Sequence, residues 1–295
     1  FKNSTIMSET LLKRNASTNA KTTNGIPLKD TSQANYFFDC DGNKGNAKGS
    51  FCCILKKGNE HFILTAGHNL KNTSGKEYKL INDNENYVEL VLVKDYRILT
   101  EQEKQSNDDL QKQGKPFKYF SHDAAVLKIN KITENNIDVY NINANTTKND
   151  VITNSKDFYG NVLGKKSGLK IESSLNISEG KASLIAYTST YREFDYYGIY
   201  TNEDNYIDDK NQKVAKDESC SKVLLLGPYD SKSIVDKGTS GDSGGLIMYK
   251  NFVLGIYLGK CKRRDNYYVR SRNLPKLSPQ DTSFFQLLIK DYEIA

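Results

Sequence analysis

The sequence is dominated by short apolar and β-branched runs separated by turns rich in Gly, Asn and Asp, and this pattern restricts the fold more than any other feature. Many short strands with turns between them are typical of an all-β barrel or sandwich and argue against alternating βαβ units. A helical period appears only at 284–289, behind start signals at 278–281, and predicts a short amphipathic C-terminal helix. The runs that we predict as strands are 50–55, 61–65, 87–93, 124–129, 181–188, 222–226, 245–249 and 252–257.

The length of 295 residues is enough to bury a substantial core, as one large domain or two smaller ones. Residues 1–30 are polar and lack both helical and strand periodicity, so we expect an N-terminal extension that is draped over a domain or disordered. The stretch 99–117 has almost no apolar residues, as expected of a surface insertion. Because residue 1 is Phe rather than Met, the sequence also fits a processed product or a piece of a longer parent chain.

The charges of the chain argue against several classes of partner. Its 42 Lys and Arg against 36 Asp and Glu give +6, and the two signs are interleaved almost one to one outside 260–264. A surface that tracks phosphates needs a continuous basic stripe, so we expect no nucleic-acid binding despite a pI near 8.8. No apolar run approaches the roughly 18 residues of a membrane-spanning helix, and we expect no membrane contact.

The cysteines follow neither a disulfide framework nor the paired spacing of a zinc site. We therefore expect free thiols, and the lack of pairing favours a reducing compartment, either cytoplasmic or in a host cytosol. No cluster of metal-ligand residues occurs, so we expect neither a metal nor a cofactor. The cysteines are Cys40, Cys52, Cys53, Cys220 and Cys261.

Two short strings place polar side chains beside apolar strands. The string Thr65-Ala66-Gly67-His68 ends one predicted strand, which puts the His68 imidazole at a strand-to-loop corner where it can face a cleft. Asp123 leads directly into the predicted strand 124–129. Taken singly, His68 would also fit a structural histidine, and Asp123 would fit a turn cap.

A third string, Gly-Asp-Ser-Gly-Gly at 241–245, is more specific. Glycines on both sides of a serine let the backbone bend tightly and aim successive N–H groups into one concavity, as an oxyanion hole beside a nucleophile requires. The alternative is a plain Gly/Ser turn between strands. Such a pentapeptide arises by chance in a chain of this length about once in several thousand cases, which favours the functional interpretation.

At these residues the sequence resembles the chymotrypsin-like serine peptidases, whose three motifs occur here in the family order of His, Asp and Ser. The resemblance implies two antiparallel β-barrels, a catalytic triad in the cleft between them and a C-terminal helix. We place the first barrel, with His68 and Asp123, at 31–150. We place the second barrel, with Ser243 and the C-terminal helix, at 151–295, because Asn-rich turns fall near the boundary.

The resemblance also implies a role for each residue. Ser243 would attack a peptide carbonyl, His68 would take its proton, and Asp123 would fix the tautomer of the imidazole. The N–H groups of Gly241 and Ser243 would stabilise the tetrahedral oxyanion. The expected function is that of a serine endopeptidase acting on proteins or peptides through an acyl-enzyme. Of the other two histidines, His61 and His122, we treat His122 as structural, because alternation along an extended chain would point its side chain away from the cleft.

The chain departs from the family pattern in two respects. It lacks the Ile/Val-x-Gly-Gly start whose new ammonium pairs with the residue equivalent to Asp242, so Asp242 must meet another cation or donor, as in bacterial and viral relatives. Otherwise the site is latent until a regulatory partner binds. The family's cysteine after the catalytic histidine is Asn69 here, although Cys53 falls where its disulfide partner would be. The missing disulfide favours a bacterial or viral type of member.

Substrate preference and biological role are the finer expectations. The residue six before the nucleophile, which in this family lies at the base of the primary pocket, is Lys237, and Lys260 follows the strand expected to form the pocket wall. Cations there would favour Asp or Glu before the scissile bond, whereas an inward-pointing Asp236 would select Lys or Arg. The long insertions and the lack of disulfides favour a restricted processing protease over a digestive one. The alternative is a non-catalytic or latent protein of the same fold that acts by binding.

Overall fold

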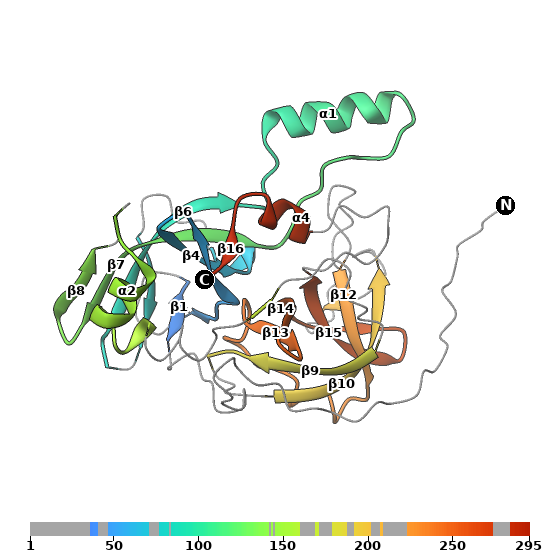
Figure 1. Ribbon diagram of the computed structural model, residues 1–295. Coiled ribbons are helices and arrows are strands. Elements are labelled where there is room, and N and C mark those ends of the chain that lie inside the picture. The colour runs from blue at the N-terminus through green and yellow to red at the C-terminus, as the bar shows by residue number, and fades with distance from the viewer. Residues whose placement is uncertain are drawn as a thin grey trace.

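The structure is a computed structural model and is built almost entirely from antiparallel strands in two sheets, which confirms the all-β prediction (Figure 1). The predicted N-terminal extension and Cys220 lie outside the described residues. The ranges that the structure describes are 36–40, 47–70, 77–82, 84–141, 143, 145–159, 169–170, 179–187, 192–201, 207–208, 223–273 and 284–295.

The first sheet carries the strands on either side of the His68 and Asp123 motifs. Within the described residues its strands pair in the order β16-β3-β4-β7-β6-β5-β1-β2, and β8 pairs with β7. These strands are β1 (Phe37–Asp39), β2 (Lys48–Gly49), β3 (Cys53–Lys57), β4 (Glu60–Thr65), β5 (Tyr78–Ile81), β6 (Tyr87–Asp95), β7 (Ala125–Glu134), β8 (Ile137–Asn141) and β16 (Glu293–Ile294).

The second sheet closes on itself. Its described strands pair in the order β11-β14-β13-β9-β10-β12-β15, and β14 also pairs with β15, so that all of them except β11 form a continuous ring of antiparallel pairs. Such closure leaves no free edge among the ring strands. The strands are β9 (Glu179–Ile185), β10 (Arg192–Thr201), β11 (Ile207–Asp208), β12 (Val223–Tyr229), β13 (Leu246–Tyr249), β14 (Phe252–Arg263) and β15 (Asn266–Asn273).

Each of the predicted runs overlaps an observed strand, with shifts at the ends that have local causes. The run 50–55 becomes β3 only from Cys53, because the backbone at Ser50 bonds to the turn that carries Ser243 rather than to a neighbouring strand. Ser50 N–H donates to the carbonyl of Ser243 at 2.7 Å, and Cys52 N–H donates to Leu64 O at 2.7 Å. The chain therefore contacts the second half of the protein at Ser50, between β2 and β3 of the first sheet.

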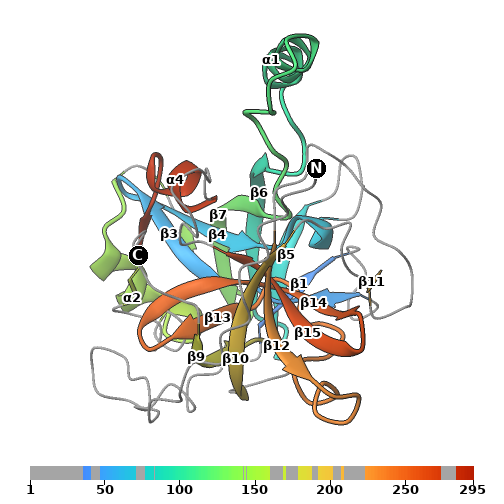
Figure 2. The same cartoon turned by 90° about the vertical axis from the view of Figure 1, so that its right-hand side faces the viewer.

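The helices are short and peripheral. The predicted C-terminal helix is confirmed as α4 (Phe284–Ile289). The predicted surface insertion contains α1 (Glu101–Lys112), which stands away from both sheets in Figures 1 and 2. Its start is a capping box, in which Thr100 accepts from Glu103 N–H and the Glu103 carboxylate accepts from Thr100 N–H. The other described helices are α2 (Lys148–Asn154) and the 3-10 turn η2 (Gly67–Asn69).

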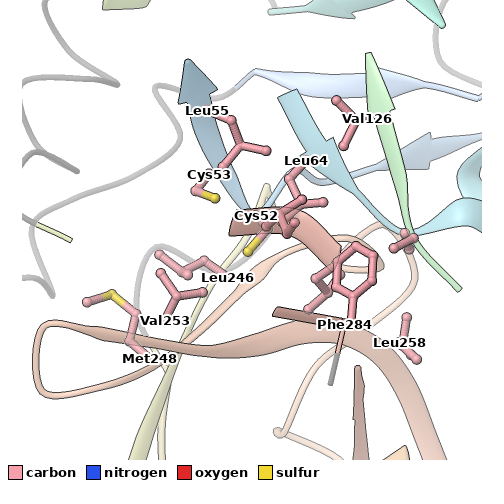
Figure 3. Close-up of a cluster of buried hydrophobic side chains, with 14 of the residues drawn as sticks. Cys52, Cys53, Leu55, Leu64, Val126, Leu246, Met248, Val253, Leu258 and Phe284 are labelled. Atoms are coloured by element: carbon pink, nitrogen blue, oxygen red, sulfur yellow. The ribbon is translucent and has the colours of Figure 1, made fainter. Parts of the chain in front are cut away.

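A shared apolar core joins the two sheets (Figure 3). Cys53 and Leu64 from the first sheet and Leu246 and Val253 from the second are each at most 1% exposed in this cluster. Burial of each such aliphatic side chain contributes about 1.5–3 kcal/mol, so the core holds the two halves together strongly. It therefore fixes the elements that carry His68 relative to the elements that flank Ser243.

The C-terminal segment closes this core from outside. Phe284 on α4 is 1% exposed, and its ring centroid lies 4.9 Å from that of Tyr96 and 5.2 Å from that of His122. Beyond the helix, β16 returns to the first sheet, where Ile294 is paired with Leu55. The end of the chain thus covers the first sheet next to the segment that leads into Asp123.

The described cysteines Cys40, Cys52, Cys53 and Cys261 are buried, and no disulfide joins them. In the part of the chain that the structure describes, no helix is both long and apolar enough to span a membrane. Within the same residues, no group of three or more His, Cys, Asp or Glu is placed to hold a metal ion.

Candidate active site

The structure brings His68 and Asp123 together through the pairing of β4 with β7. Thr65 at the end of β4 is paired with Ala125 at the start of β7, so the residues just beyond each strand meet at the same edge. His68 Nδ1 lies 2.7 Å from Asp123 Oδ2, and the backbone N–H of His68 donates to Asp123 Oδ1 at 2.8 Å. Asp123 therefore holds both the ring and the backbone of His68.

Electrostatics set the protonation of this pair. Burial by itself raises the pKa of Asp123, but the charge of His68, its two hydrogen bonds and the charge of Arg270 outweigh burial and hold the pKa below its usual range. Asp123 is thus ionised at neutral pH and can only accept hydrogen bonds. Nδ1 of neutral His68 must carry the proton, which leaves the lone pair of Nε2 available as a base.

The turn that carries Ser243 is held by a buried carboxylate. Asp242 is fully buried, its Oδ2 accepts the N–H of Thr239 at 2.9 Å, and its own N–H donates to Thr239 O at 3.1 Å. The N–H of Thr239 is thus one donor to the Asp242 carboxylate that does not come from a new N-terminus. The glycines Gly241 and Gly244 have φ of 99° and 93°, a region that side chains rarely adopt, which explains why glycine occurs at both positions.

Two N–H groups of this turn donate no hydrogen bond within the described part of the chain. Those of Asp242, Gly244 and Gly245 donate to backbone carbonyls. By contrast, no acceptor within the described residues receives a hydrogen bond from the N–H of Gly241 or of Ser243. These two groups belong to the residues predicted as the oxyanion hole, and they are available to an oxygen of a bound substrate.

Ser243 is attached to the first sheet through its carbonyl. Ser243 O accepts the N–H of Ser50 at 2.7 Å and Nδ2 of Asn69 at 2.8 Å. Asn69 directly follows His68 in the chain, so the carbonyl of the serine is held by the residue next to the histidine. Among the described contacts there is no hydrogen bond between the Ser243 hydroxyl and the His68 ring. Such bonds often tighten only when substrate binds.

The two predicted pocket cations lie near the same segment, 235–237. The Lys237 side chain is 17% exposed and its Nζ lies 3.3 Å from Asp236 Oδ1, whereas the side chain of Asp236 is 74% exposed. Lys260 Nζ donates to Val235 O at 3.5 Å. The lysine of the 236–237 pair is therefore the one that faces the protein.

Arg270 is a cation near the site that our sequence analysis did not select. It is paired with Gly259 across β14 and β15, and its Nη2 donates to Leu258 O at 3.1 Å. Its charge also contributes to the low pKa of Asp123, which places it within electrostatic reach of the His68 and Asp123 pair. No motif marked this residue, because only the strand pairing brings it there.

The other two histidines are buried, and their rings contact aromatic side chains. His61 is 1% exposed and its ring lies 5.5 Å from that of Tyr159. His122 is 3% exposed against Phe284, and its Nδ1 has no hydrogen-bond partner among the described residues. Burial first, and then the charges of Arg272 and Lys94, lower the pKa of His122 well below its usual value.

Buried His122 leads to a prediction on acid stability. Because its pKa is lower in the folded than in the unfolded state, its neutral form supports folding above pH ~6.5, and stability is lost as the pH falls below that value. In His122→Phe the free energy of unfolding should fall less steeply as the pH is lowered from about 6.5 to about 5. The slope should be smaller than in the wild type by up to about 1.4 kcal/mol per pH unit. Urea unfolding of both proteins across this range measures the difference. Parallel curves would contradict the prediction.

The expectation for the missing disulfide needs a correction. The residue that abuts Asn69 is Gly49, since a Cβ added there would lie 2.6 Å from Asn69 Nδ2. Cys53 instead lies in the core between the sheets. The place expected for a cysteine partner is therefore taken by a glycine, which leaves room for the Asn69 amide.

Comparison with known proteins finds similarity at the level of structure only. No protein-family model matches the chain, and no curated protein matches it. Solved structures that are similar to it are bacterial and viral serine proteases. Protease A of Thermobifida fusca has 11% identity and a TM-score of 0.36, covering 81% of this chain and 89% of that protein.

Two further structures show likeness of the same degree. The serine protease of a human pathogenic astrovirus has 10% identity and a TM-score of 0.37, covering 90% of this chain and 99% of that protein. The chymotrypsin of Cellulomonas bogoriensis has 11% identity and a TM-score of 0.38, covering 90% and 98%. The function proposed below therefore rests on the geometry of the site.

Proposed function

We propose that the protein is a chymotrypsin-like serine endopeptidase with His68, Asp123 and Ser243 as its catalytic triad. The observation that carries this proposal is the coupled pair of His68 and Asp123, whose neighbour Asn69 binds the carbonyl of a serine next to two free N–H groups. A histidine oriented by a carboxylate, a serine nearby and paired backbone donors are the parts that acyl transfer requires.

The geometry supports the following sequence of proton transfers. Nε2 of His68 takes the hydroxyl proton of Ser243 as Oγ attacks the substrate carbonyl, and the resulting imidazolium is stabilised by ionised Asp123. The oxyanion accepts hydrogen bonds from the N–H groups of Gly241 and Ser243. His68 then gives its proton to the leaving amine, and an acyl-enzyme forms on Ser243. Water, activated by His68, hydrolyses that ester and regenerates the serine.

A preference for Asp or Glu before the scissile bond is the finer part of the proposal. Lys237 is the better buried member of its pair with Asp236, which favours a cation over an anion in the pocket. Lys260 reaches the same segment, and Arg270 adds a third positive charge opposite Gly259. An acidic side chain is the natural complement of such a group of cations.

This preference predicts a change of selectivity in Lys237→Gln. We expect kcat/KM for peptides with Asp or Glu before the scissile bond to fall about 10- to 100-fold, since a hydrogen bond to a charged group contributes about 1.5–3 kcal/mol. Cleavage of a peptide library by both proteins measures the change. Lys112→Gln, at an exposed position on α1, is the matched control. Cutting after Lys or Arg by the wild type would contradict the acidic preference.

A restricted processing role is the second detailed part of the proposed function. The insertion that carries α1 lies between β6 and β7 and leads directly into Asp123, so it can limit which substrates reach the triad. A processing enzyme of this kind should cut casein at few sites. Its indiscriminate degradation would contradict the restricted role without affecting the proposed chemistry.

Labelling with a fluorophosphonate tests the proposed function, because this probe reacts only with an activated serine. We expect the wild type to be labelled and Ser243→Ala and His68→Ala to remain unlabelled while folded. A folded wild type that takes no label would contradict an assembled active site and would favour the alternative of a latent or binding protein.

A further inference from the structure

We propose that Asn69 is a positioning residue that holds the nucleophile turn against the histidine turn through its side-chain amide. The inference rests on the proposed function, because it assigns a task within the same site. It goes beyond that function in naming a residue that touches neither the reacting atoms nor the substrate. Its basis is a buried polar cluster formed by Ser50, Thr65 and Asn69, called here the Asn69 cluster.

The amide of Asn69 connects the two turns directly. Asn69 is 3% exposed, and its Nδ2 donates to Ser243 O at 2.8 Å and to Thr65 Oγ1 at 3.0 Å. An NH₂ group has two hydrogens, so these bonds use its donor capacity in full, and Ser50 O at 3.4 Å is only a weak third contact. One hydrogen of the NH₂ group therefore binds the serine residue, and the other binds the strand that precedes the histidine.

The rest of the Asn69 cluster makes this contact rigid. Thr65 Oγ1 donates to Ser50 O at 2.7 Å, and Ser50 N–H donates to Ser243 O at 2.7 Å. Ser50 Oγ donates to Gly241 O at 2.8 Å and accepts Tyr187 N–H at 2.7 Å. Both residues that offer free N–H groups are thus held by their carbonyls. Buried polar groups that are satisfied in this way fix a single arrangement.

Glycine at two positions allows the close approach. A Cβ added to Gly244 would lie 2.2 Å from Ser50 O, 2.4 Å from Thr65 Oγ1 and 2.8 Å from Asn69 Nδ2. A Cβ on Gly49 would also meet the Asn69 amide, at 2.6 Å. The amide therefore lies close to two backbone segments that only glycine lets come so near.

Asn69 links the cluster to catalysis because it is the neighbour of His68 in the chain. Asn69 follows His68 within η2, whose backbone is closed by the N–H of Asn69 on Ala66 O at 3.2 Å. A displacement of the amide therefore moves the backbone of His68 and the carbonyl of Ser243 relative to each other. Since acyl transfer is sensitive to shifts of about 1 Å between reacting groups, the hydrogen bonds of Asn69 control how well the base meets the nucleophile.

The test compares Asn69→Ala with Asn82→Ala, a control that removes another buried asparagine of the first half of the chain. Asn82 is 5% exposed and its Nδ2 donates to Asp157 Oδ2 at 3.0 Å, away from the triad. Both variants should lower the melting temperature. Only Asn69→Ala should lower kcat and the rate constant of fluorophosphonate labelling, by about 10- to 100-fold, with KM changed by less than about threefold.

The outcomes separate the inference from the proposed function. If the wild type is labelled and Asn69→Ala keeps its kcat, or if both variants lose activity only in proportion to the unfolded fraction, Asn69 is merely structural and the inference is wrong. If the wild type itself is not labelled, the proposed function fails and the inference fails with it. Should Asn69→Ala not fold, Asn69→Ser serves instead, because its hydroxyl is too short to reach Ser243 O, and the same loss of kcat is expected.

Discussion

Substitution of Ser243 by Ala should abolish peptide hydrolysis almost completely, with a fall in kcat of about 10⁶-fold. Without Oγ no acyl-enzyme can form. The remaining catalysis comes from the N–H groups of residues 241 and 243, which can still stabilise the oxyanion formed when water attacks the substrate. The variant keeps its backbone donors and its carbonyl contacts to Ser50 and Asn69, so it should fold and bind substrate. Steady-state hydrolysis of a peptide cut by the wild type measures the effect.

The control for this prediction lies in the same turn. Ser240 is exposed and three residues before Ser243, so Ser240→Ala removes a hydroxyl just before the string 241–245 without touching the proposed nucleophile. It should keep kcat within about twofold. Retention of hydrolysis by Ser243→Ala, or equal losses in both variants, would show that Ser243 is not the nucleophile.

Asp123→Asn should have the second largest effect, a fall in kcat of about 10⁴-fold. The shape of the side chain is kept, and its remaining oxygen can still accept the N–H of His68, as Asp123 Oδ1 does at 2.8 Å. The new NH₂ group, however, donates to Nδ1 and forces the proton of the ring onto Nε2. His68 then offers no lone pair to the hydroxyl of Ser243, and the negative charge that stabilises the imidazolium is lost.

The measurement for this prediction is kcat alongside KM and circular dichroism. KM should change little, since Asp123 does not bind the substrate, and the spectrum should match that of the wild type. Asp138→Asn is a matched control, because Asp138 is an exposed acid whose ion pair with Lys131 lies on the same sheet. A kcat for Asp123→Asn close to that of this control would contradict the assigned role of Asp123.

The sequence patterns predicted the strands whose apolar character is continuous, and missed those whose burial depends on distant partners. The strand β15 reads as polar, yet Ser271 and Arg272 in it are at most 1% exposed. Their burial follows from pairing with both β12 and β14, which a local pattern does not reveal. The two-residue strand β16 is too short for any periodicity. The start of helix α1 is readable in the sequence as the capping box of Thr100 and Glu103, although the stretch 99–117 as a whole has the composition of an insertion.

The candidate site likewise contains some residues that the sequence indicates and others that only the fold brings together. The sequence motifs indicate the chemistry of three residues, which could therefore be selected without a structure: His68, Asp123 and Ser243. The pairing of β4 with β7 places the first two of them in contact. Ser50 and Arg270 gave no local signal, because each reaches the site through a contact between segments far apart in the sequence. Asn69 was recognised only as a missing cysteine, and its hydrogen bonds needed the fold.

The most direct test of the proposed chemistry is the pre-steady-state hydrolysis of an activated ester by the wild type, with mass spectrometry of the quenched enzyme. A serine acyl-enzyme predicts a burst of about one equivalent of leaving group and an acyl adduct on the peptide that contains Ser243. The burst and the adduct should both be absent from Ser243→Ala. A wild type without a burst, or an adduct on any residue other than Ser243, would contradict the account.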